Sequence, residues 1–573
     1  MAHTRSIIIG IDFGTTYSKV VFAESDNPDE LLEVSDWPAN QANTSQASTQ
    51  VPTVARYLDN GKFEWGGLVP EQSSDAHRLF KLALEPALFQ KAADTIGDVP
   101  IPGNVDKVIT DYLTGLWDYV VKYVCERFDC DKLENVQVIL TVPAIWSDLS
   151  KQRTVQAFQR IRNLDKSITI TLLSEPEAAA ISALQDVDRN SLKHQDTFVV
   201  LDAGGGTVDL ITYTITSLFP VLEVQEATAG TGDFCGSSLV NLRFDEFMTA
   251  RLQHEPKWSA KVSKDAHDRF ENEVKRGFSL ASVAANETHN IPVGGLARNP
   301  DVGIMRNGVF ALKSAEIHMF FERYILRTIQ LAREQIRRCE KPVRSILLVG
   351  GFGASRYLRE RLELAIKDDP SIRTPVEILQ PPHAWLAAAR GAVKKGLAQV
   401  RPENYNIPMV ISRQARKHYG IELGVPYNSV SHASLASKQY WNGLMGEWYV
   451  PAMVWFIRKG NNVSEDIPFL KSYSSQWPVG GTRPERTFPM NIYADETSQT
   501  APIGRSSSVK LLCRLSADLS SIPDHQFGTR LGVDGRMYYY LEFDIEAVYH
   551  SASTQYTLIY QEKRYDTVSA EYV

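Results

Sequence analysis

The chain has 573 residues, a net charge of −7 and a sequence pI near 6.0, with 43% hydrophobic and 23% charged residues. This length predicts more than one folded unit. The mild negative charge gives no electrostatic reason to expect nucleic acid or an anionic membrane as a partner. No run approaches the roughly 20 apolar residues of a membrane-spanning helix, and the apolar start at residues 7–11 is too short for a signal peptide. These features predict a cytoplasmic protein, with the nucleus as the alternative.

Short aliphatic runs alternate with segments of helical periodicity as far as about residue 397. The clearest predicted strands are residues 6–10, 136–142, 168–173, 198–201 and 345–349, and each is a continuous apolar run, typical of a strand covered on both faces. Between the strands, residues 105–128 and 314–338 are predicted helices, and the second repeats apolar side chains at helical spacing. This alternation predicts an α/β architecture.

The pattern changes in the last third of the chain. Residues 541–549 alternate apolar and acidic side chains, and a polar turn leads into another predicted strand at residues 556–560. Several such strands predict a compact antiparallel β-sandwich. The sequence therefore predicts a domain at 1–397, a linker at 398–416 and a β-rich domain at 417–573.

Three glycine-bearing turns each follow a predicted strand: residues 12–17 (DFGTTY), 202–209 (DAGGGTVD) and 350–355 (GGFGAS). Glycine lets backbone N–H groups approach a phosphate without an intervening Cβ atom. Asp12 and Asp202 begin the first two turns, where carboxylates can hold a hydrated Mg²⁺ beside phosphate oxygens. A single turn of this kind is usually structural, but two that pair an acid with phosphate donors favour a nucleotide site. The P-loop and dinucleotide-binding glycine patterns do not occur at these turns.

These turns resemble the two phosphate motifs and the adenosine motif of the actin, hexokinase and heat shock protein 70 superfamily. Residues 140–144 (LTVPA), 173–180 (LSEPEAAA) and 273–279 (EVKRGFS) resemble motifs of the heat shock protein 70 branch. The similarity spans roughly residues 5–397. It implies a two-lobed, actin-like ATPase domain, built as a duplicated ribonuclease H-like fold, with ATP and Mg²⁺ in the cleft.

The β-rich tail is similar to the same family over shorter stretches. Residues 418–422 (HYGIE) and 453–461 (MVWFIRKGN) resemble early strands of its peptide-binding sandwich, and no helical lid follows. The overall pattern is most similar to the divergent lid-less branch of the "member 12" type. This resemblance implies ATP or ADP as ligand and polypeptide clients or co-chaperones as partners. We expect a monomer without nucleic-acid or membrane partners.

The resemblance also implies roles for individual residues, matched by position. The metal site would comprise Asp12, Glu175 and Asp202. The phosphates would lie against Gly14, Thr15, Thr16, Tyr17, Gly204, Gly205, Gly206 and Thr207. Asp209 and Thr207 would orient the attacking water, with Glu175 completing the catalytic group. The adenosine would be surrounded by Lys275, Arg276, Ser279, Gly350 and Gly351. A solvated helix face remains the alternative for Lys275 and Arg276, and a hinge or capping acid remains the alternative for Glu175.

Two departures from the family pattern bear on activity. The family's catalytic lysine is missing from residues 65–70 (WGGLVP), and Lys81 nearby belongs to a helix-like segment to which we assign no catalytic role. The adenine-stacking arginine of the family falls near Ala354, and the acid that ends the adenosine site is missing from residues 381–385, so Phe352 becomes the candidate to stack on the base. We therefore expect Mg-ATP binding with slow or absent hydrolysis, in a chaperone-like or regulatory nucleotide switch. A small-molecule kinase of the same superfamily and a pseudo-ATPase scaffold remain the alternatives.

Overall fold

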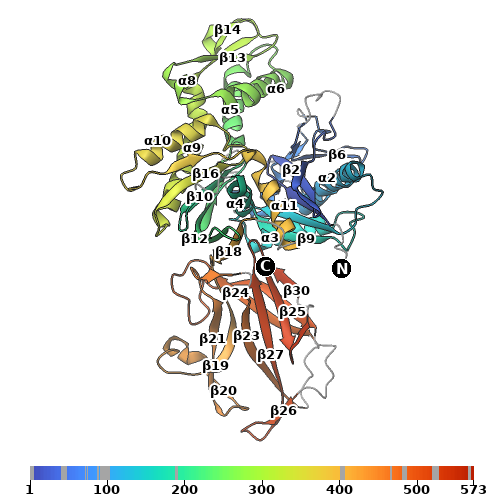
Figure 1. Cartoon of the computed structure of the whole chain (residues 1–573), viewed down its shortest axis with the longest axis vertical. Coiled ribbons are helices and arrows are strands. Elements are labelled where there is room, and N and C mark those ends of the chain that lie inside the picture. The colour runs from blue at the N-terminus through green and yellow to red at the C-terminus, as the bar shows by residue number, and fades with distance from the viewer. Residues whose placement is uncertain are drawn as a thin grey trace. The chain divides into compact units, whose positions relative to one another are not determined.

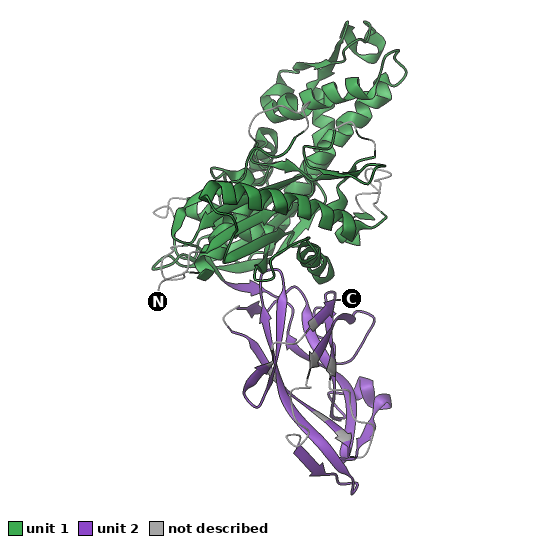
Figure 2. Ribbon diagram, turned by 90° about the vertical axis from the view of Figure 1, so that its right-hand side faces the viewer, with its two compact units in different colours: residues 1–410 green, residues 411–573 purple. Residues whose placement is uncertain are grey.

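The computed structural model describes residues 6–39, 48–70, 73, 75–86, 89–90, 103–186, 192–400, 407–464, 467–479, 487–518, 528–565 and 569–572. It divides into unit 1, Met1–Val410, and unit 2, Ile411–Val573 (Figure 2). The division falls within residues 398–416, the predicted linker. Part of that linker lies outside the described residues, and Met409–Gln414 is a strand, β18. The fold is mixed α/β with several sheets.

The first sheet of unit 1 has the strand order β3-β2-β1-β8-β9, with β4 beside β2. Figure 1 labels two of these strands, β2 and β9. Its central strand, β1, pairs antiparallel with β2 and parallel with β8. The strands are β1 (Ile7–Asp12), β2 (Tyr17–Glu24), β3 (Asn27–Glu33), β4 (Val51–Pro52), β8 (Val136–Val142) and β9 (Thr169–Ser174). All six residues of β1 are buried, as its apolar sequence predicts.

Five strands of the second sheet repeat this arrangement, in the order β12-β11-β10-β16-β17, and the sheet continues beyond β12. Its central strand β10 is antiparallel to β11 and parallel to β16. The strands are β10 (Thr197–Ala203), β11 (Val208–Ser217), β12 (Glu223–Asp233), β16 (Val343–Val349) and β17 (Glu377–Leu379). The repeated order places Asp12, at the end of β1, and Asp202, near the end of β10, in equivalent positions.

Two helices lie between the sheets, α4 (Glu175–Asp186) and α11 (Ala387–Val400) (Figure 1). A Cβ atom on Gly391 would come within 1.7 Å of the carbonyl oxygen of Ala178, so glycine is required where the helices touch. Apolar side chains of α11 join those of β1 and β8 in one core, and alanines of α4 pack against β10 and β11 in another. This packing brings the two acid-bearing strand ends to a common region.

The remaining elements of unit 1 cover the outer faces or extend from them. The helical elements are α2 (Val105–Phe128), α3 (Asp148–Gln159), α5 (Ser238–Leu252), α6 (Ala260–Arg269), α7 (Lys275–Gly277), α8 (Leu280–Ala284), α9 (Ser314–Arg338) and α10 (Arg356–Lys367), with the short turns η1 (Phe80–Leu84), η3 (Phe270–Val274), η4 (Pro300–Val302) and η5 (Ala384–Leu386). Smaller sheets contain β5 (Val54–Tyr57), β6 (Phe63–Trp65), β7 (His77–Arg78), β13 (Thr288–Pro292), β14 (Ile304–Arg306) and β15 (Val309–Lys313). None of the helices in the described part of the chain combines the length and apolar character needed to cross a membrane.

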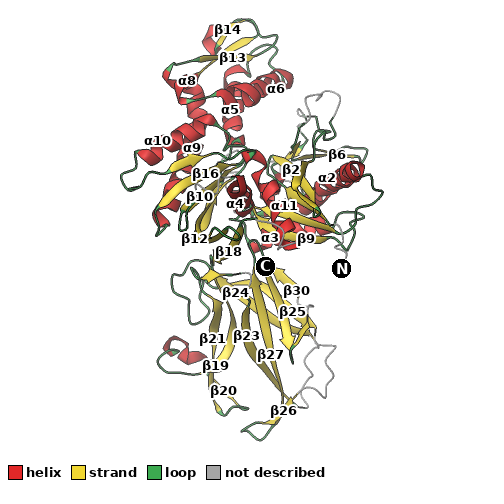
Figure 3. Ribbon diagram, in the orientation of Figure 1, coloured by secondary structure: helices red, strands yellow, loops and turns green. Residues whose placement is uncertain are grey.

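Unit 2 consists mainly of strands in two sheets (Figure 3). One has the order β20-β21-β19-β24-β25-β30 and the other β23-β27-β28-β29, with β26 beside β27. The elements are β19 (His418–Pro426), η6 (Ala433–Lys438), β20 (Tyr440–Asn442), β21 (Glu447–Ile457), β22 (Asn462–Val463), β23 (Phe469–Pro478), β24 (Thr487–Asp495), β25 (Lys510–Asp518), β26 (Gly528–Leu531), β27 (Met537–Tyr549), β28 (Thr554–Tyr560), β29 (Lys563–Tyr565) and β30 (Ser569–Tyr572). Ile421 and Ile492 of the first sheet share a core with Phe543 and Leu558 of the second.

Candidate functional site

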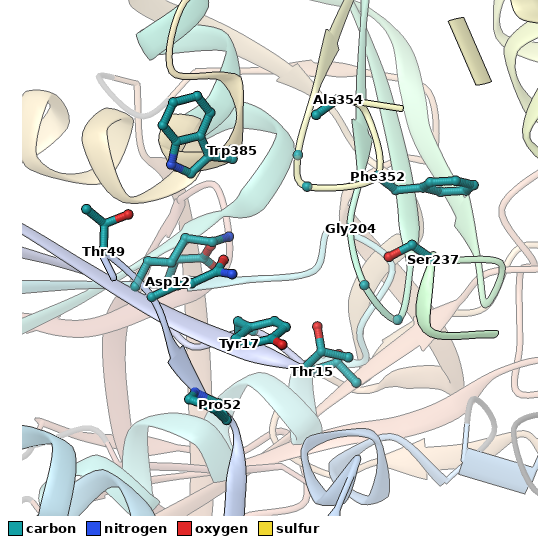
Figure 4. A pocket seen from close by; sticks show the side chains of 18 of the residues that line it. Asp12, Thr15, Tyr17, Thr49, Pro52, Gly204, Ser237, Phe352, Ala354 and Trp385 are labelled. Atoms are coloured by element: carbon teal, nitrogen blue, oxygen red, sulfur yellow. The ribbon is translucent and has the colours of Figure 1, made fainter. Parts of the chain in front are cut away.

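A cavity of about 1240 Å³ lies in unit 1 where the three glycine turns meet (Figure 4). Its lining includes every site residue predicted from the sequence except Ser279: Asp12, Gly14, Thr15, Thr16, Tyr17, Glu175, Asp202, Gly204, Gly205, Gly206, Thr207, Asp209, Lys275, Arg276, Gly350, Gly351 and Phe352. Residues that are up to 340 positions apart in the sequence therefore surround one space. These residues come together only when unit 1 is folded.

The first two glycine turns interlock. A Cβ atom on Gly205 would come within 2.0 Å of Thr16 Oγ1, and one on Gly206 within 2.8 Å of the Thr15 Cβ atom. The turns approach so closely that larger residues at either glycine would displace a threonine. Thr15 and Thr16, with the backbone of the second turn, therefore form one polar surface at the end of β1 and β10, of the kind that phosphate oxygens bind.

The second turn is held from behind by the start of the segment that leads into α5. The backbone N–H groups of Gly236 and Ser238 donate to the carbonyl oxygens of Gly206 (3.0 Å) and Gly205 (2.9 Å), and the Ser238 hydroxyl adds a bond of 2.7 Å to Gly205 O. These bonds occupy carbonyl oxygens of the turn and fix its shape before any ligand is bound. A rigid set of donors loses less conformational freedom on binding.

The third turn packs against the end of β10. Gly350 has a φ of +85°, and a Cβ atom there would lie 2.4 Å from Asp202 Oδ1. Its N–H donates to the carbonyl of Ala384 (2.9 Å), and the N–H of Phe352 donates to Ala203 O (2.8 Å). The turn is thereby joined both to the acid of the second turn and to the η5 segment beyond it.

Several carboxylates face one another across this cavity. Burial, followed by the charges of Glu175 and Asp12, raises the pKa of Asp202 well above its usual value. Burial and the charge of Glu175 raise the pKa of Asp209 to about 7. Burial also raises the pKa of Glu175, against the opposing effect of Lys81. These acids keep their protons to higher pH because their negative charges would repel one another. A bound cation would relieve that repulsion.

The donor set fits a hydrated Mg²⁺, which prefers oxygen ligands and retains several waters. Within the described residues, no group of three or more His, Cys, Asp or Glu side chains is close enough to hold a metal ion directly. Asp12, Glu175 and Asp202 nevertheless line the same cavity. Their arrangement suits contact through metal-bound water and phosphate oxygens.

Thr207 hydrogen-bonds the Asp209 side chain, but one of the two carboxyl oxygens lacks a partner in the described part of the chain. The Asp209 side chain is 1% exposed, and among the described residues its Oδ1 atom has no hydrogen-bond partner. An unsatisfied buried acceptor is costly unless a water or ligand supplies the missing donor. This oxygen can therefore accept a hydrogen bond from a water molecule in the cavity.

Two lysines that the sequence analysis did not include also line the cavity. Lys81 Nζ lies 2.8 Å from Glu175 Oε1, and Lys19 Nζ lies 3.0 Å from Asp12 Oδ2. The ammonium of Lys81 also faces the rings of Phe13 (5.6 Å) and Trp146 (5.1 Å). Lys81 belongs to a helical turn, as its sequence predicts, and η1 turns its side chain inward to an acid of the cavity.

Each lysine left a signal in the sequence. Lys81 is the single charged residue of the apolar run 79–84, where a charge is costly unless it is paired. Lys19 is opposite Asp12 in the antiparallel pair of β1 and β2, and directly opposed residues of unlike charge interact. The short turn between β1 and β2 sets their register, and that register places Lys19 opposite Asp12.

The residues expected to surround the adenosine differ in their solvent exposure. Lys275 is 7% exposed, forms an ion pair with Glu271 and donates to Asn241 Oδ1 at 2.8 Å, whereas Arg276 is exposed. Lys275 is therefore buried and paired, whereas Arg276 lines the cavity with an exposed side chain. Ser279 is 4% exposed and accepts a hydrogen bond from Ser282 N at the start of α8, so the structure places it as a helix cap outside the cavity lining.

Phe352 reaches the cavity lining from within the hydrophobic core. Its side chain is 2% exposed, and its ring is stacked with that of Phe321 on α9 at a centroid distance of 6.3 Å. In Figure 4 the ring extends away from Trp385. The geometry therefore gives Phe352 a packing role rather than an open face on which a base can stack.

Comparisons with known proteins find similarity in both parts of the chain. Residues 120–378 match the family described as Hsp70 protein, and residues 413–572 match a domain of unknown function, DUF8568. The chain is similar to a chaperone protein HscA homolog of Bordetella pertussis, with 25% identity over 387 residues, which cover 64% of this chain and 55% of the relative. The chaperone protein dnaK of Cyanidium caldarium is 24% identical over 432 residues, covering 68% of this chain and 61% of the relative. An HscA homolog of Burkholderia ambifaria is 28% identical over 377 residues, or 62% and 54% of the two chains.

These matches define a coarse class. Unit 1 is a mixed α/β unit with a cavity at its glycine turns, and it contains the segment that matches the Hsp70 family. The chain has Hsp70-family homologues at low identity, and it spans between 54% and 61% of the length of the three relatives named above.

Proposed function

We propose that unit 1 binds Mg-ATP in the cavity between its two sheets and acts as a nucleotide switch of the Hsp70 type. One observation carries this proposal: two glycine turns, at equivalent ends of sheets with the same strand order, interlock through Gly205 and Thr16. The phosphates would lie against both turns, with Asp12, Glu175 and Asp202 around the hydrated metal. Lys275, Arg276, Gly350 and Gly351 would surround the adenosine.

The repeated strand order also supports the finer description of the fold. We assign unit 1 to the two-lobed, actin-like architecture with a duplicated ribonuclease H-like core, one copy for each of the two main sheets. Unit 2, with two sheets sharing one core, is assigned as a β-sandwich related to the peptide-binding domain of the same family. The lid-less "member 12" branch remains our proposed placement within it.

We further propose that the protein hydrolyses ATP slowly. Bound Mg²⁺ would supply charge neutralisation at the phosphates. Asp209, with its unpartnered Oδ1, would accept a hydrogen bond from the attacking water, and the water oxygen would displace ADP from the γ-phosphorus. Lys81 would place a positive charge near that phosphate, which removes the main reason for expecting no hydrolysis at all. The ion pair of Lys81 with Glu175 supports this role.

The biological role proposed for this switch is chaperone-like or regulatory. It rests on the relatives, whose names describe chaperone proteins. Polypeptide clients or co-chaperones are the proposed partners, and a monomer is the proposed state. The cytoplasmic location stays a prediction from the sequence.

The direct test combines binding and turnover on the full chain. Titration calorimetry with Mg-ATP and release of inorganic phosphate should show binding together with slow turnover. Asp209→Asn should retain binding and reduce phosphate release, because the substitution leaves the turns intact.

Binding without any phosphate release would favour the pseudo-ATPase scaffold. Phosphate transfer to a small acceptor instead of water would favour the kinase alternative. Absence of binding would reject the proposal.

A further inference from the structure

One large aromatic side chain in the cavity lining has no role in the site described so far. Trp385 belongs to η5 and is 42% exposed, although large aromatic side chains are usually buried. The Gly350 N–H bonds the carbonyl of its neighbour Ala384 at 2.9 Å. Trp385 is therefore fixed beside the third glycine turn, at the side of the cavity away from the phosphate turns.

The other aromatic residues in the described part of the lining are unsuited to present a flat face there. Phe352 is stacked within the core, and Trp37 is 9% exposed, with its ring packed at 5.2 Å from that of Tyr119. Tyr17 is 38% exposed but closes the first glycine turn, beside the threonines. Trp385 thus offers the accessible aromatic surface near the third turn.

The ring of His383 lies 5.5 Å from the indole of Trp385, tilted by 55°, and the neighbours on the third turn leave room for a flat ligand. Ala354 lines the same part of the cavity with a side chain of a single methyl group, and Gly351 has open space where a Cβ atom would be. Figure 4 shows the indole and Ala354 on the same side of the cavity. Nucleobases bind such surfaces by stacking, because every base has a π face.

We propose that Trp385 is the surface on which the base of a bound nucleotide stacks. This inference rests on the proposed function, and it transfers to Trp385 the role that the sequence analysis gave to Phe352. Stacking depends on ring area, so the contribution of Trp385 should be larger for purine than for pyrimidine nucleotides. It should be absent for a ligand that carries phosphates without a base.

The experiment compares Trp385→Leu and Trp385→Phe with the full-length wild type. Dissociation constants are measured by calorimetry for Mg-ADP, for the Mg complex of cytidine diphosphate and for Mg-tripolyphosphate. Tryptophan fluorescence is recorded in the same titrations, since the chain contains 10 tryptophans. Trp441→Leu is the matched control, because Trp441 is 53% exposed in β20 of unit 2.

We expect Trp385→Leu to weaken Mg-ADP binding about 10-fold or more, as base–aromatic stacking implies. The loss should be smaller for the cytidine nucleotide and absent for tripolyphosphate. Trp385→Phe should recover most of the affinity. Quenching of fluorescence by ADP should disappear in Trp385→Leu and persist in Trp441→Leu.

Equal affinity of wild type and Trp385→Leu for Mg-ADP would overturn the inference while leaving the proposed nucleotide binding intact. A loss that is as large for tripolyphosphate as for ADP would also overturn it, because it would show a structural effect on the whole cavity. A wild type that binds no nucleotide would instead reject the proposed function itself.

Discussion

The ammonium of Lys81 lies 2.8 Å from Glu175 Oε1, although these residues come from separate segments, η1 and the start of α4. Lys81 is 1% exposed and has aromatic rings on two sides. A lysine buried in such surroundings is stabilised only where an acid accompanies it. The pair therefore holds the Lys81 ammonium in the wall of the cavity, beside the Glu175 carboxylate.

Replacing Lys81 separates binding from turnover. In Lys81→Met the apolar stem is retained and the charge is lost, so phosphate release should fall by roughly 100-fold or more, the usual effect of removing one group that stabilises the transition state. The dissociation constant of Mg-ATP should change much less. The exposed Lys122→Met is the matched control (side chain 71% exposed). Unchanged turnover in Lys81→Met would exclude Lys81 from the reaction.

Lys19 should lower the dependence of nucleotide binding on Mg²⁺. Its ammonium is paired with Asp12, so it offsets part of the negative charge that would otherwise repel phosphate. In Lys19→Met, ATP affinity measured with a chelator present should fall by about 10-fold more than affinity measured with Mg²⁺. Calorimetry under both conditions checks this, again with Lys122→Met as control. Equal losses under the two conditions would contradict the prediction.

The two interlocked turns provide a steric test. Gly205→Val should abolish Mg-ATP binding, because its Cβ atom would displace Thr16 and disturb both turns. Gly294→Val, where no atom lies within 4 Å of the added Cβ, is the matched control and should bind normally. Asp209→Asn should bind nearly as well as the wild type in the same calorimetric assay. The assigned roles are wrong if Asp209→Asn loses affinity as severely as Gly205→Val.

The pKa of Asp209 predicts how stability varies with pH in the absence of ligand. Burial and the Glu175 charge raise this pKa to about 7, whereas an unfolded chain gives about 3.9. The folded state therefore holds the proton more tightly, and the free energy of unfolding decreases as the pH rises from about 4 to about 7. Asp209→Asn removes this ionisation, so the fall in melting temperature between about pH 5 and pH 8 should be smaller than in the wild type.

The exposed Asp301→Asn serves as the control for that series. Its melting temperature should follow the wild-type pH dependence. A wild-type slope in Asp209→Asn would show that the acid does not hold its proton as the cavity geometry implies.

The sequence predicted the elements with strong periodicity well. The predicted helices at residues 105–128 and 314–338 coincide with α2 and α9, and the Asn104 side chain caps the first by accepting from Lys107 N at 3.0 Å. The alternation at residues 541–549 is confirmed as the C-terminal part of β27. Local spacing and caps fix such elements before tertiary packing contributes.

The site was predictable where its residues end equivalent strands, as Asp12 and Asp202 do. Trp385 was not, because its position depends on how the short turn η5 packs onto the sheets. The apolar run around Lys81 indicated a paired, buried charge but not its partner Glu175. The burial of Phe352 was also beyond the local sequence, since it is decided by Phe321 on a distant helix. Motifs thus located the end of the cavity at the glycine turns better than the end beside Trp385.

The central claim, that a folded unit 1 forms a Mg-ATP site, is tested most directly by thermal unfolding of the full chain. A ligand that binds only the folded state, present at about 100 times its dissociation constant, adds roughly 2.7 kcal/mol to the free energy of unfolding. We therefore predict a clear rise in melting temperature with millimolar Mg-ATP in the wild type and in Gly294→Val, and none in Gly205→Val. A wild-type melting curve that Mg-ATP leaves unchanged, together with no heat of binding by calorimetry, would contradict the account.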